Sequence, residues 1–446
     1  MEINMLRELF MILAYILCYF HFARSTENSE GDQAENGTKS SGRKILVFGG
    51  NGFIGSETVR RLLDKEDEIT IVNRGNWYFD SEERIKPFVS AHFRCDRDKL
   101  LKIECEELST SGTDSIYEVC EKTHSGPSTE EDAVRPKSGR KRLELKREEE
   151  YAHDKLACEE VLQEQRKSGG FPYVALRFPD VIGPRDNSFR FWTYQLWIRI
   201  HKDIGHPVHM PSAVSDIEFS LIYVEDAAKA IEKVLDVGPV AHNQAINLAF
   251  NEHFTLKTLL RNMADKLSID ELEFISEDEA TWYSYPTVTK GPLDVSKAKL
   301  LLDWEPMTWE RALDSLYTFF EGAMTDEKFL KEREILLADF FESIVPEEHY
   351  GTALKKLFKI YGNDVLQGIA MDVGFDETLE IEGASDAQNS SAAHGQKSAE
   401  KGTGAHVSDE SDGESVDEIV EEIDSENEAV TSSSESTNKD KHSDEL

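Results

Sequence analysis

The stretch KILVFGGNGFIG, residues 44–55, decides the fold expected for this chain. Its first five residues favour a strand, and its last seven place a glycine at every third position. Residues 57–63 continue with apolar side chains at helical spacing, and residues 69–72 form a second apolar run. A strand, a glycine turn, a helix and a second strand within about 30 residues predict a Rossmann-like, doubly wound parallel sheet.

The glycine turn also predicts a dinucleotide site. Its first glycine permits a tight turn, its second lets a pyrophosphate approach the backbone at the helix N-terminus, and its third lets the helix close onto the sheet. NAD sites usually carry an acidic residue after the second strand, whereas this chain has Arg74, which can pair with a 2′-phosphate. We therefore expect NADP or NAD, with NADP favoured and a plain surface charge at Arg74 as the alternative. The turn residues expected to bind the cofactor are Gly49, Asn51, Gly52, Phe53, Ile54 and Gly55.

Tyr151 and Lys155 stand four residues apart at the start of a helical stretch, so they share one helix face. A phenol with a pKa near 10 is a poor base at neutral pH, but a neighbouring ammonium favours the phenolate. Lys155 can also hold the cofactor ribose. The pair predicts a tyrosine general base supported by a lysine.

These motifs occur in the order seen in extended short-chain dehydrogenase/reductases. Over about residues 44–325 the chain resembles their NAD-dependent epimerase/dehydratase branch, through the glycine turn, the Tyr151 pair, RFPDVIGPRD at 177–186 and IYVEDAA at 222–228. The resemblance implies that Thr113 is a third catalytic hydroxyl, with Ser111 and Ser115 as rivals. It also implies an adenine contact at Asp96 and a nicotinamide contact at Pro179.

The resemblance implies hydride transfer on a nucleotide-sugar or a related hydroxyl or carbonyl substrate, with Tyr151 as the base. Epimerase, dehydratase and reductase outcomes share this chemistry and stay open. Arg185 is an expected contact for the substrate phosphate. Many relatives dimerise through the tyrosine-bearing helix, which implies a homodimer. We expect no metal site, since the cysteines form no CxxC pair.

The middle of the predicted sheet is short. Residues 75–150 must hold two further strand–helix units, yet residues 118–150 are typical of a polar loop. Residues 91–95 predict one strand and residues 98–108 one helix, after which the chain goes straight to the Thr113 loop. We therefore expect missing central strands, which leave their neighbours unpaired if the chain is a shortened form; the alternative is that the sheet is rebuilt in another way. The alternative function is an inactive or impaired lumenal dinucleotide-binding scaffold.

Both ends of the chain indicate the endoplasmic reticulum lumen. An apolar run at residues 9–20 is too short to span a bilayer and predicts a signal peptide at 1–23, with a short anchor as the alternative. The terminal HSDEL, residues 442–446, resembles a retrieval signal and implies a retrieval receptor. We expect no stable membrane span. Cys95, Cys105, Cys120 and Cys158 permit three full disulfide pairings.

The chain has 446 residues and a formal net charge of −37, which disfavours nucleic acid as a partner. RNA binding is a weaker alternative, because the end of the second strand resembles that of the chloroplast stem-loop-binding branch. Residues 371–446 hold 22 acidic and four basic side chains, so they predict an acidic disordered tail. The expected parts are a signal peptide at 1–23, a disordered leader at 24–43, a dinucleotide-binding lobe at 44–178, a smaller α/β substrate lobe at 179–325, a helical extension at 326–362 and the tail at 363–446.

Overall fold

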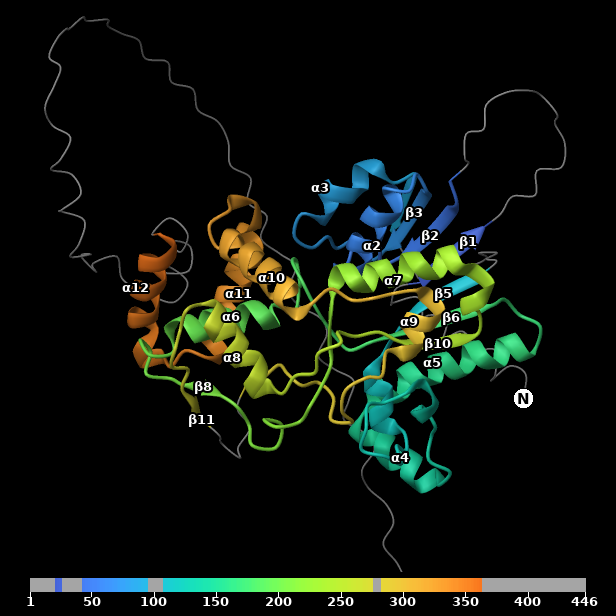
Figure 1. Cartoon of the computed structure of the whole chain (residues 1–446). Helices are drawn as coiled ribbons and strands as arrows, with labels where there is room; N and C mark the ends of the chain where they lie inside the picture. Colours follow the sequence, from blue (N-terminus) through green and yellow to red (C-terminus); the bar gives the residue numbers. More distant parts are fainter. Residues whose placement is uncertain (1–20, 26–41, 95–106, 276–281, 363–446) are drawn as a thin grey trace, which may run out of the picture. The chain divides into compact units, whose positions relative to one another are not determined.

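A computed structural model of the chain describes residues 21–25, 42–94, 107–275 and 282–362. Within these ranges seven strands form one sheet in the order β10-β6-β5-β1-β2-β3-β4 (Figure 1). The strands are β1 (His21–Ser25), β2 (Lys44–Phe48), β3 (Glu68–Asn73), β4 (Ala91–Arg94), β5 (Glu107–Thr113), β6 (Tyr173–Phe178) and β10 (Gln244–Asn247). The acidic tail, the retrieval sequence, Asp96 and most of the predicted leader lie outside the described residues.

Helices cover both faces of this sheet. On one face α2 (Phe53–Leu63) and α7 (Val224–Val237) lie side by side, with Val59 and Ile231 in one buried cluster with the sheet (Figure 1). On the other face α5 (Glu150–Lys167) packs Leu162 against Leu108 and Tyr173 of the sheet. Six of the seven strands pair in parallel with one another wherever they adjoin. The expected Rossmann-like α/β fold is confirmed.

The strand that leads into Thr113 is present, so the expectation that it is missing was wrong. β5 pairs in parallel with β6 from Leu108↔Tyr173 to Thr113↔Phe178. Its sequence, ELSTSGT, contains one large apolar residue, and this is why an apolar pattern did not reveal it. Ser109 is buried, and a side chain at Gly112 would meet Glu159 Oε1 at 3.0 Å. The polar composition of β5 is explained by the charged Glu159 and Arg177 side chains that pack next to Gly112.

The second missing strand is replaced by a segment from the N-terminal end of the chain. β1 lies between β2 and β5 and pairs antiparallel with both, with His21 opposite Phe48 on one side and Thr110 on the other. The backbone donors and acceptors that face each other across this gap are satisfied by β1. Three of its five residues belong to the predicted signal peptide, so cleavage after Ala23 would cut the strand.

Two further local expectations differ from the structure. Residues 139–148 form helix α4 (Gly139–Glu148) within the segment predicted as a polar loop. Ser138 caps this helix by accepting a hydrogen bond from the Lys141 N–H. The helix predicted at residues 98–108 cannot reach Leu108, which lies in β5, and its residues up to 106 lie outside the described part.

The second lobe and the helical extension share one aromatic core. Trp192 on α6 (Arg190–Ile200), Phe320 on α10 (Trp309–Ala323) and Phe340 on α11 (Leu330–Ser343) are all buried in it. The extension therefore packs as part of the folded lobe. The other elements of this region are β7 (Asp180–Ile182), β8 (Val208–His209), β9 (Leu221–Tyr223), β11 (Phe274–Ile275), α8 (Leu256–Lys266), α9 (Ser296–Leu302) and α12 (Tyr350–Tyr361).

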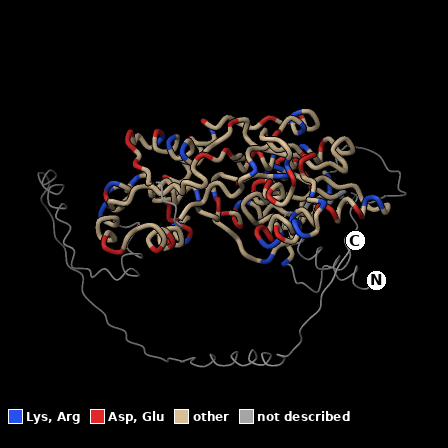
Figure 2. The backbone as a smooth tube through the Cα atoms, turned by 90° about the horizontal axis from the view of Figure 1, so that it is seen from below, with Lys and Arg blue, Asp and Glu red and all other residues tan. Residues whose placement is uncertain are grey.

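No helix among the described ones is both long and apolar enough to cross a bilayer. Acidic and basic residues are interspersed along the described backbone (Figure 2).

Candidate active site

The glycine turn follows the carboxyl end of β2, where parallel sheets of this class bind their ligands. Gly49 has φ 73°, a left-handed conformation that favours glycine, and its N–H donates to Val72 O at 2.8 Å. Gly52 is the N-cap of α2, and no side chain caps the first N–H groups of this helix. The turn therefore fits a pyrophosphate, because these N–H groups are open to an anion at a helix N-terminus.

The remaining turn residues have distinct surroundings. The Asn51 side-chain amide donates to Asn76 O, which lies in the loop after β3. Ile54 packs against the core of the nucleotide lobe, and Gly55 is buried. A side chain at Gly183 would meet Val224 Cγ1 at 2.4 Å and the Phe53 ring at 3.3 Å, so Phe53 lies against the start of the substrate lobe.

Arg74 is exposed at the end of β3, and a second arginine shares this edge of the sheet. The register pairs Asn73 with Arg94, the last residue of β4. A side chain at Gly75 would meet Arg94 Nε at 3.1 Å, so the Arg94 side chain lies over the turn that follows Arg74. Sequence reasoning missed Arg94, although its place at the end of the next expected strand was available as a signal. Two guanidinium groups near one strand end suit a phosphate monoester.

Tyr151 and Lys155 lie on one face of α5, with Lys155 Nζ 5.7 Å from the centroid of the Tyr151 ring. Tyr151 is 44% exposed, whereas Lys155 is buried. Burial lowers the pKa of Lys155 to about 8, and the nearby Cys158 and Glu159 only partly offset this effect. The pair thus combines an accessible phenol with an ammonium whose charge is weakly solvated.

Thr113 ends β5 and begins the 3₁₀ helix η2 (Asp114–Val119), against which α5 packs. Its Oγ1 accepts the Ser115 N–H at 3.2 Å and lies 3.1 Å from Ser115 Oγ. The two hydroxyls are therefore one hydrogen-bonded unit, while Ser111 lies two residues earlier on β5. Asp114 was not predicted as a site residue. Burial, followed by the nearby Asp180 and Glu118, raises its pKa well above the usual range.

A buried ion pair joins the tyrosine helix to the sheet. Arg177 on β6 donates to both carboxylate oxygens of Glu159 on α5, at 2.7 and 3.2 Å, and each side chain is 3% exposed. Arg177 Nη1 also donates to Tyr117 Oη at 2.9 Å, and that hydroxyl donates to Asn247 Oδ1 at 2.7 Å. The network fixes α5 relative to β6 and β10, and therefore sets the height of Tyr151 above the sheet.

One expected nicotinamide contact and one expected phosphate contact border this region. Pro179 is buried between β6 and β7. Arg185, an expected phosphate contact, instead forms a two-pronged ion pair with Asp80, with Nη2 at 2.9 Å from Oδ2. Its guanidinium is therefore occupied by a carboxylate. Among the described residues, no cluster of His, Cys, Asp and Glu is arranged to hold a metal ion.

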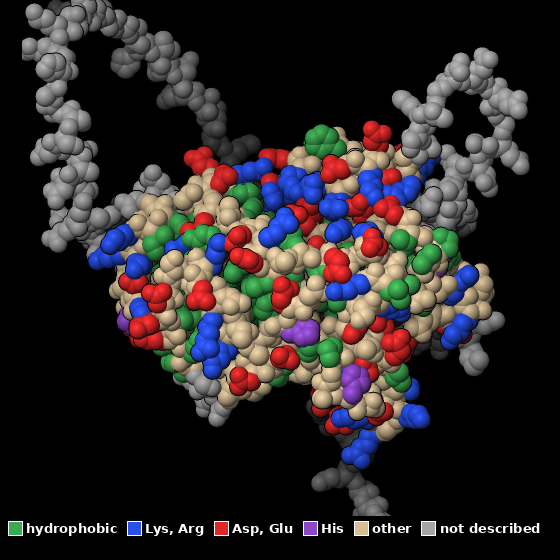
Figure 3. Space-filling view, in the orientation of Figure 1, with side chains coloured by type: hydrophobic (Ala, Val, Ile, Leu, Met, Phe, Trp, Pro, Cys, Tyr) green, Lys and Arg blue, Asp and Glu red, His purple; other side chains and the backbone are tan. Residues whose placement is uncertain are grey.

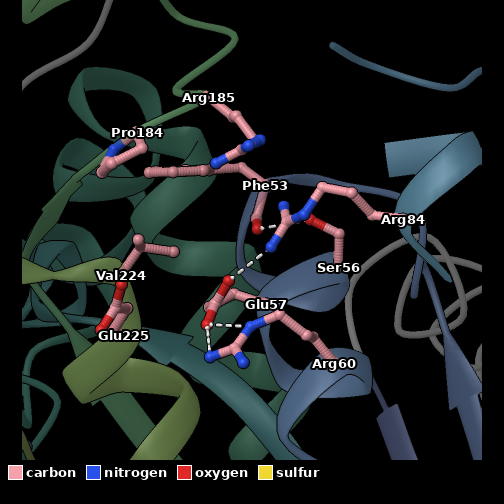
Figure 4. Close-up of a pocket in the computed structure, with 9 residues that line it drawn as sticks. All are labelled: Phe53, Ser56, Glu57, Arg60, Arg84, Pro184, Arg185, Val224 and Glu225. Carbon is pink, nitrogen blue, oxygen red and sulfur yellow. Dashed lines mark hydrogen bonds and ion pairs between the residues drawn. The ribbon is translucent and has the colours of Figure 1, made fainter. Parts of the chain in front are cut away.

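A small pocket of about 100 Å³ lies beside the turn (Figure 4). Glu57 on α2 stands on its wall between Arg60 and Arg84, at 2.5 and 3.0 Å. Despite burial, these two guanidinium groups hold the pKa of Glu57 below its usual range. Three of the charged side chains in the lining are therefore paired with one another. The lining residues are Phe53, Ser56, Glu57, Arg60, Arg84, Pro184, Arg185, Val224 and Glu225.

Comparison with known proteins gives two relatives of low identity. The chain is 25% identical over 312 residues to the chloroplast stem-loop binding protein of 41 kDa b from Arabidopsis thaliana, covering 60% of this chain and 76% of the relative. It is 21% identical over 333 residues to the low-salt glycan biosynthesis protein Agl12 from Haloferax volcanii, covering 62% of this chain and 98% of the relative.

Solved structures match a similar share of this chain. The chain matches UDP-glucose 4-epimerase from Thermotoga maritima with 20% identity and a TM-score of 0.46, over 62% of this chain and 98% of the other. It matches UDP-glucuronic acid 4-epimerase from Bacillus cereus with 18% identity and a TM-score of 0.48, over 61% and 98%.

The sequence model of the NAD dependent epimerase/dehydratase family matches residues 98–249, the segment that carries Thr113, Tyr151, Lys155 and Pro179. This segment of the chain therefore matches the NAD-dependent epimerase/dehydratase family that its motifs resemble.

Proposed function

We propose that this protein is an NAD(P)-dependent oxidoreductase that interconverts a hydroxyl and a carbonyl on a nucleotide-sugar or a related substrate. The observation that carries the proposal is that the buried Lys155 lies next to the accessible Tyr151 on one helix. A buried ion pair joins this helix to the sheet whose strand β2 leads into the glycine turn. An accessible phenol beside a buried ammonium suits a general base. When bound, the nicotinamide supplies the hydride acceptor or donor.

The residues of the chain supply proton transfer, substrate orientation and cofactor binding. Tyr151 takes the proton from the substrate hydroxyl as the carbonyl forms and returns it in the reverse direction. The Lys155 ammonium stabilises the phenolate by its charge. Thr113, held by Ser115, donates a hydrogen bond to the substrate oxygen and so orients it. The open N–H groups at the start of α2 hold the pyrophosphate.

Arg94 supports NADP over NAD as the cofactor. Arg74 and Arg94 lie at neighbouring strand ends, and no acidic residue follows Asn73 before Asp80. Asp80 is already paired with Arg185, so it is not free to accept hydrogen bonds from a ribose. A 2′-phosphate would find two cations at this edge.

The test of this function is turnover with candidate nucleotide-sugars, compared between the wild type and Tyr151→Phe. We expect Tyr151→Phe to bind the dinucleotide as the wild type does while losing about two to four powers of ten in kcat. Equal turnover by the two proteins would contradict Tyr151 as the base. Binding without turnover by either protein, over a panel of sugars, would support the scaffold alternative. The antiparallel β1 in the centre of the sheet is the observation that keeps this alternative open.

RNA binding, the weaker alternative suggested by the resemblance to the chloroplast stem-loop-binding branch, has less support in this chain. Lys and Arg side chains gather over α2, α3 (Ser81–Ile85) and α7 on one face (Figure 3), but acidic partners neutralise them. Arg61 pairs with Glu232 at 2.6 Å, and Lys65 pairs with Asp236 at 2.6 Å. We expect weak RNA affinity with a shallow salt dependence. A steep loss of affinity with salt would contradict this expectation.

We propose the endoplasmic reticulum lumen as the location, from the apolar run at residues 9–20 and the terminal HSDEL. The mass of the protein recovered from the secretory pathway tests where the leader ends. Since His21 pairs with both Phe48 and Thr110, we expect the mature chain to keep residue 21. Cleavage after Ala23 in a folded, active protein would show that β1 is dispensable.

A further inference from the structure

One loop connects the glycine turn to the helical extension. We call residues 76–81 the latch; they form the end of the loop after β3 and the first residue of α3, Ser81, in the nucleotide lobe. At one end the latch is bonded to the turn, because Asn51 donates to Asn76 O and Ser81 Oγ donates to Asn51 O at 3.2 Å. The backbone of Asn51 is thus held by a segment outside the turn.

The middle of the latch inserts into the second lobe. The Phe79 ring lies 6.1 Å from Phe189, 6.0 Å from Phe319 and 5.8 Å from Phe329, measured between centroids. Phe79 has φ 49° and Phe189 has φ 56°, left-handed values that cost a phenylalanine free energy. Packing of the four rings offsets this cost, so the contact defines the loop conformation.

The extension supplies the polar part of the same contact. Glu332 on α11 accepts the Phe79 N–H at 2.9 Å. Lys328, in η5 (Glu327–Phe329), bridges Asp80 and Glu83 at 3.3 and 3.0 Å. Asp80 is buried and also pairs with Arg185. These polar contacts hold the latch in addition to the aromatic cluster.

We propose that the latch makes the helical extension a positioning element for the dinucleotide, with Phe79, Phe329 and Glu332 as positioning residues. This inference rests on the proposed cofactor site. The chain of contacts runs from Glu332 and Phe329 through Phe79 to Ser81 and Asn51. Most of these residues lie outside residues 98–249, the segment that matches the family. When the latch opens, the turn is competent for binding only part of the time, and the apparent Kd becomes the intrinsic Kd divided by the competent fraction.

The experiment titrates NADPH and NADH into the full chain and its variants, by nucleotide fluorescence. We expect Phe79→Ala and Phe329→Ala each to raise Kd about tenfold, and the double variant to raise it little further, because both open one latch. Glu332→Gln keeps the shape of the contact and should raise Kd by a smaller factor. In turnover, KM for the dinucleotide should rise while kcat stays unchanged.

Two controls separate positioning from general destabilisation. Leu330→Ala changes an exposed side chain next to Phe329, and Phe88→Ala changes an exposed ring in the nucleotide lobe. Both should bind like the wild type. Wild-type Kd in all three latch variants, or an equal rise in the controls, would overturn the proposal.

Amide hydrogen exchange across residues 49–55 is the second readout, and it needs no cofactor. We expect faster exchange there in Phe329→Ala and Glu332→Gln, although both substitutions lie in the extension. Unchanged exchange would refute the latch whatever the protein binds. Absence of dinucleotide binding by the wild type, with faster exchange in the variants, would instead refute the proposed function and keep the mechanical link.

Discussion

Substitution of Glu159 by glutamine tests the buried network that sets the position of the tyrosine helix. Glu159→Gln keeps the side-chain size but leaves the Arg177 guanidinium, which is 3% exposed, without its carboxylate. Burial alone would lower the pKa of Arg177, but Glu159 and then Tyr117 hold it above its usual value, so the arginine stays charged. Removal of one partner of a buried ion pair costs about 3–5 kcal/mol of unfolding free energy.

We expect a loss near the lower end of that range, about 3 kcal/mol, because Tyr117 Oη and Glu130 O still accept from Arg177. Urea denaturation followed by tryptophan fluorescence measures it. Glu160→Gln is the matched control, since Glu160 is 46% exposed and its ion pair with Arg135 should be worth less than about 1 kcal/mol. Equal losses for the two variants would refute the reasoning. Glu159→Gln with Arg177→Met should recover part of the loss, because no unpaired charge remains.

Three further outcomes follow from the structure. Burial lowers the pKa of Lys155 to about 8, so protonation of this side chain opposes folding. Between about pH 8 and 10.5 the unfolding free energy of the wild type should therefore rise relative to that of Lys155→Met, by up to roughly 3 kcal/mol. Urea midpoints that rise equally in both proteins would contradict this prediction. Gly183→Ala should destabilise the protein by about 1–3 kcal/mol, since the new methyl would lie 2.4 Å from Val224 Cγ1, and unchanged thermal unfolding would refute that contact. Arg94→Glu should weaken NADPH binding by at least about tenfold and leave NADH binding within about twofold, because only NADPH carries the 2′-phosphate. Equal losses of affinity for the two dinucleotides in a binding titration would show that Arg94 does not contact the 2′-phosphate.

The elements predicted from sequence are those whose burial follows a simple period. In β2, Ile45 and Val47 are buried and lie two residues apart, as the alternation of a strand requires, and the glycine turn follows directly. The extension was also predicted, because Leu336, Leu337 and Phe340 recur at helical spacing and are buried.

The missed features depend on contacts between residues distant in sequence. β5 is polar because Gly112 and its neighbours accommodate the pair Glu159–Arg177, which no local pattern reveals. β1 completes the sheet by pairing across segments that adjoin only in the fold. Phe79 occurs in a short loop that shows no periodic pattern, and its three ring partners lie 110 or more residues later.

The placement of the proposed base was predicted only in part. The spacing of Tyr151 and Lys155 gave their common helix face, which the structure has. The burial of Lys155 and the locked position of α5 come from Glu159 and Arg177, residues that the motif does not contain. The residues of the proposed base can thus be recognised from a local spacing in the sequence, whereas the position of their helix depends on contacts across the assembled sheet.

The measurement that tests the central claim most directly is equilibrium binding of NADPH and NADH to the purified full chain. The structure predicts saturable binding at one site per chain. Tyr151→Phe should retain this binding, whereas Gly49→Val should lose it, because residue 49 has φ 73°, a conformation that valine rarely adopts. Absence of saturable binding up to about 1 mM of either dinucleotide would contradict the claim that this chain is a nicotinamide-dependent enzyme.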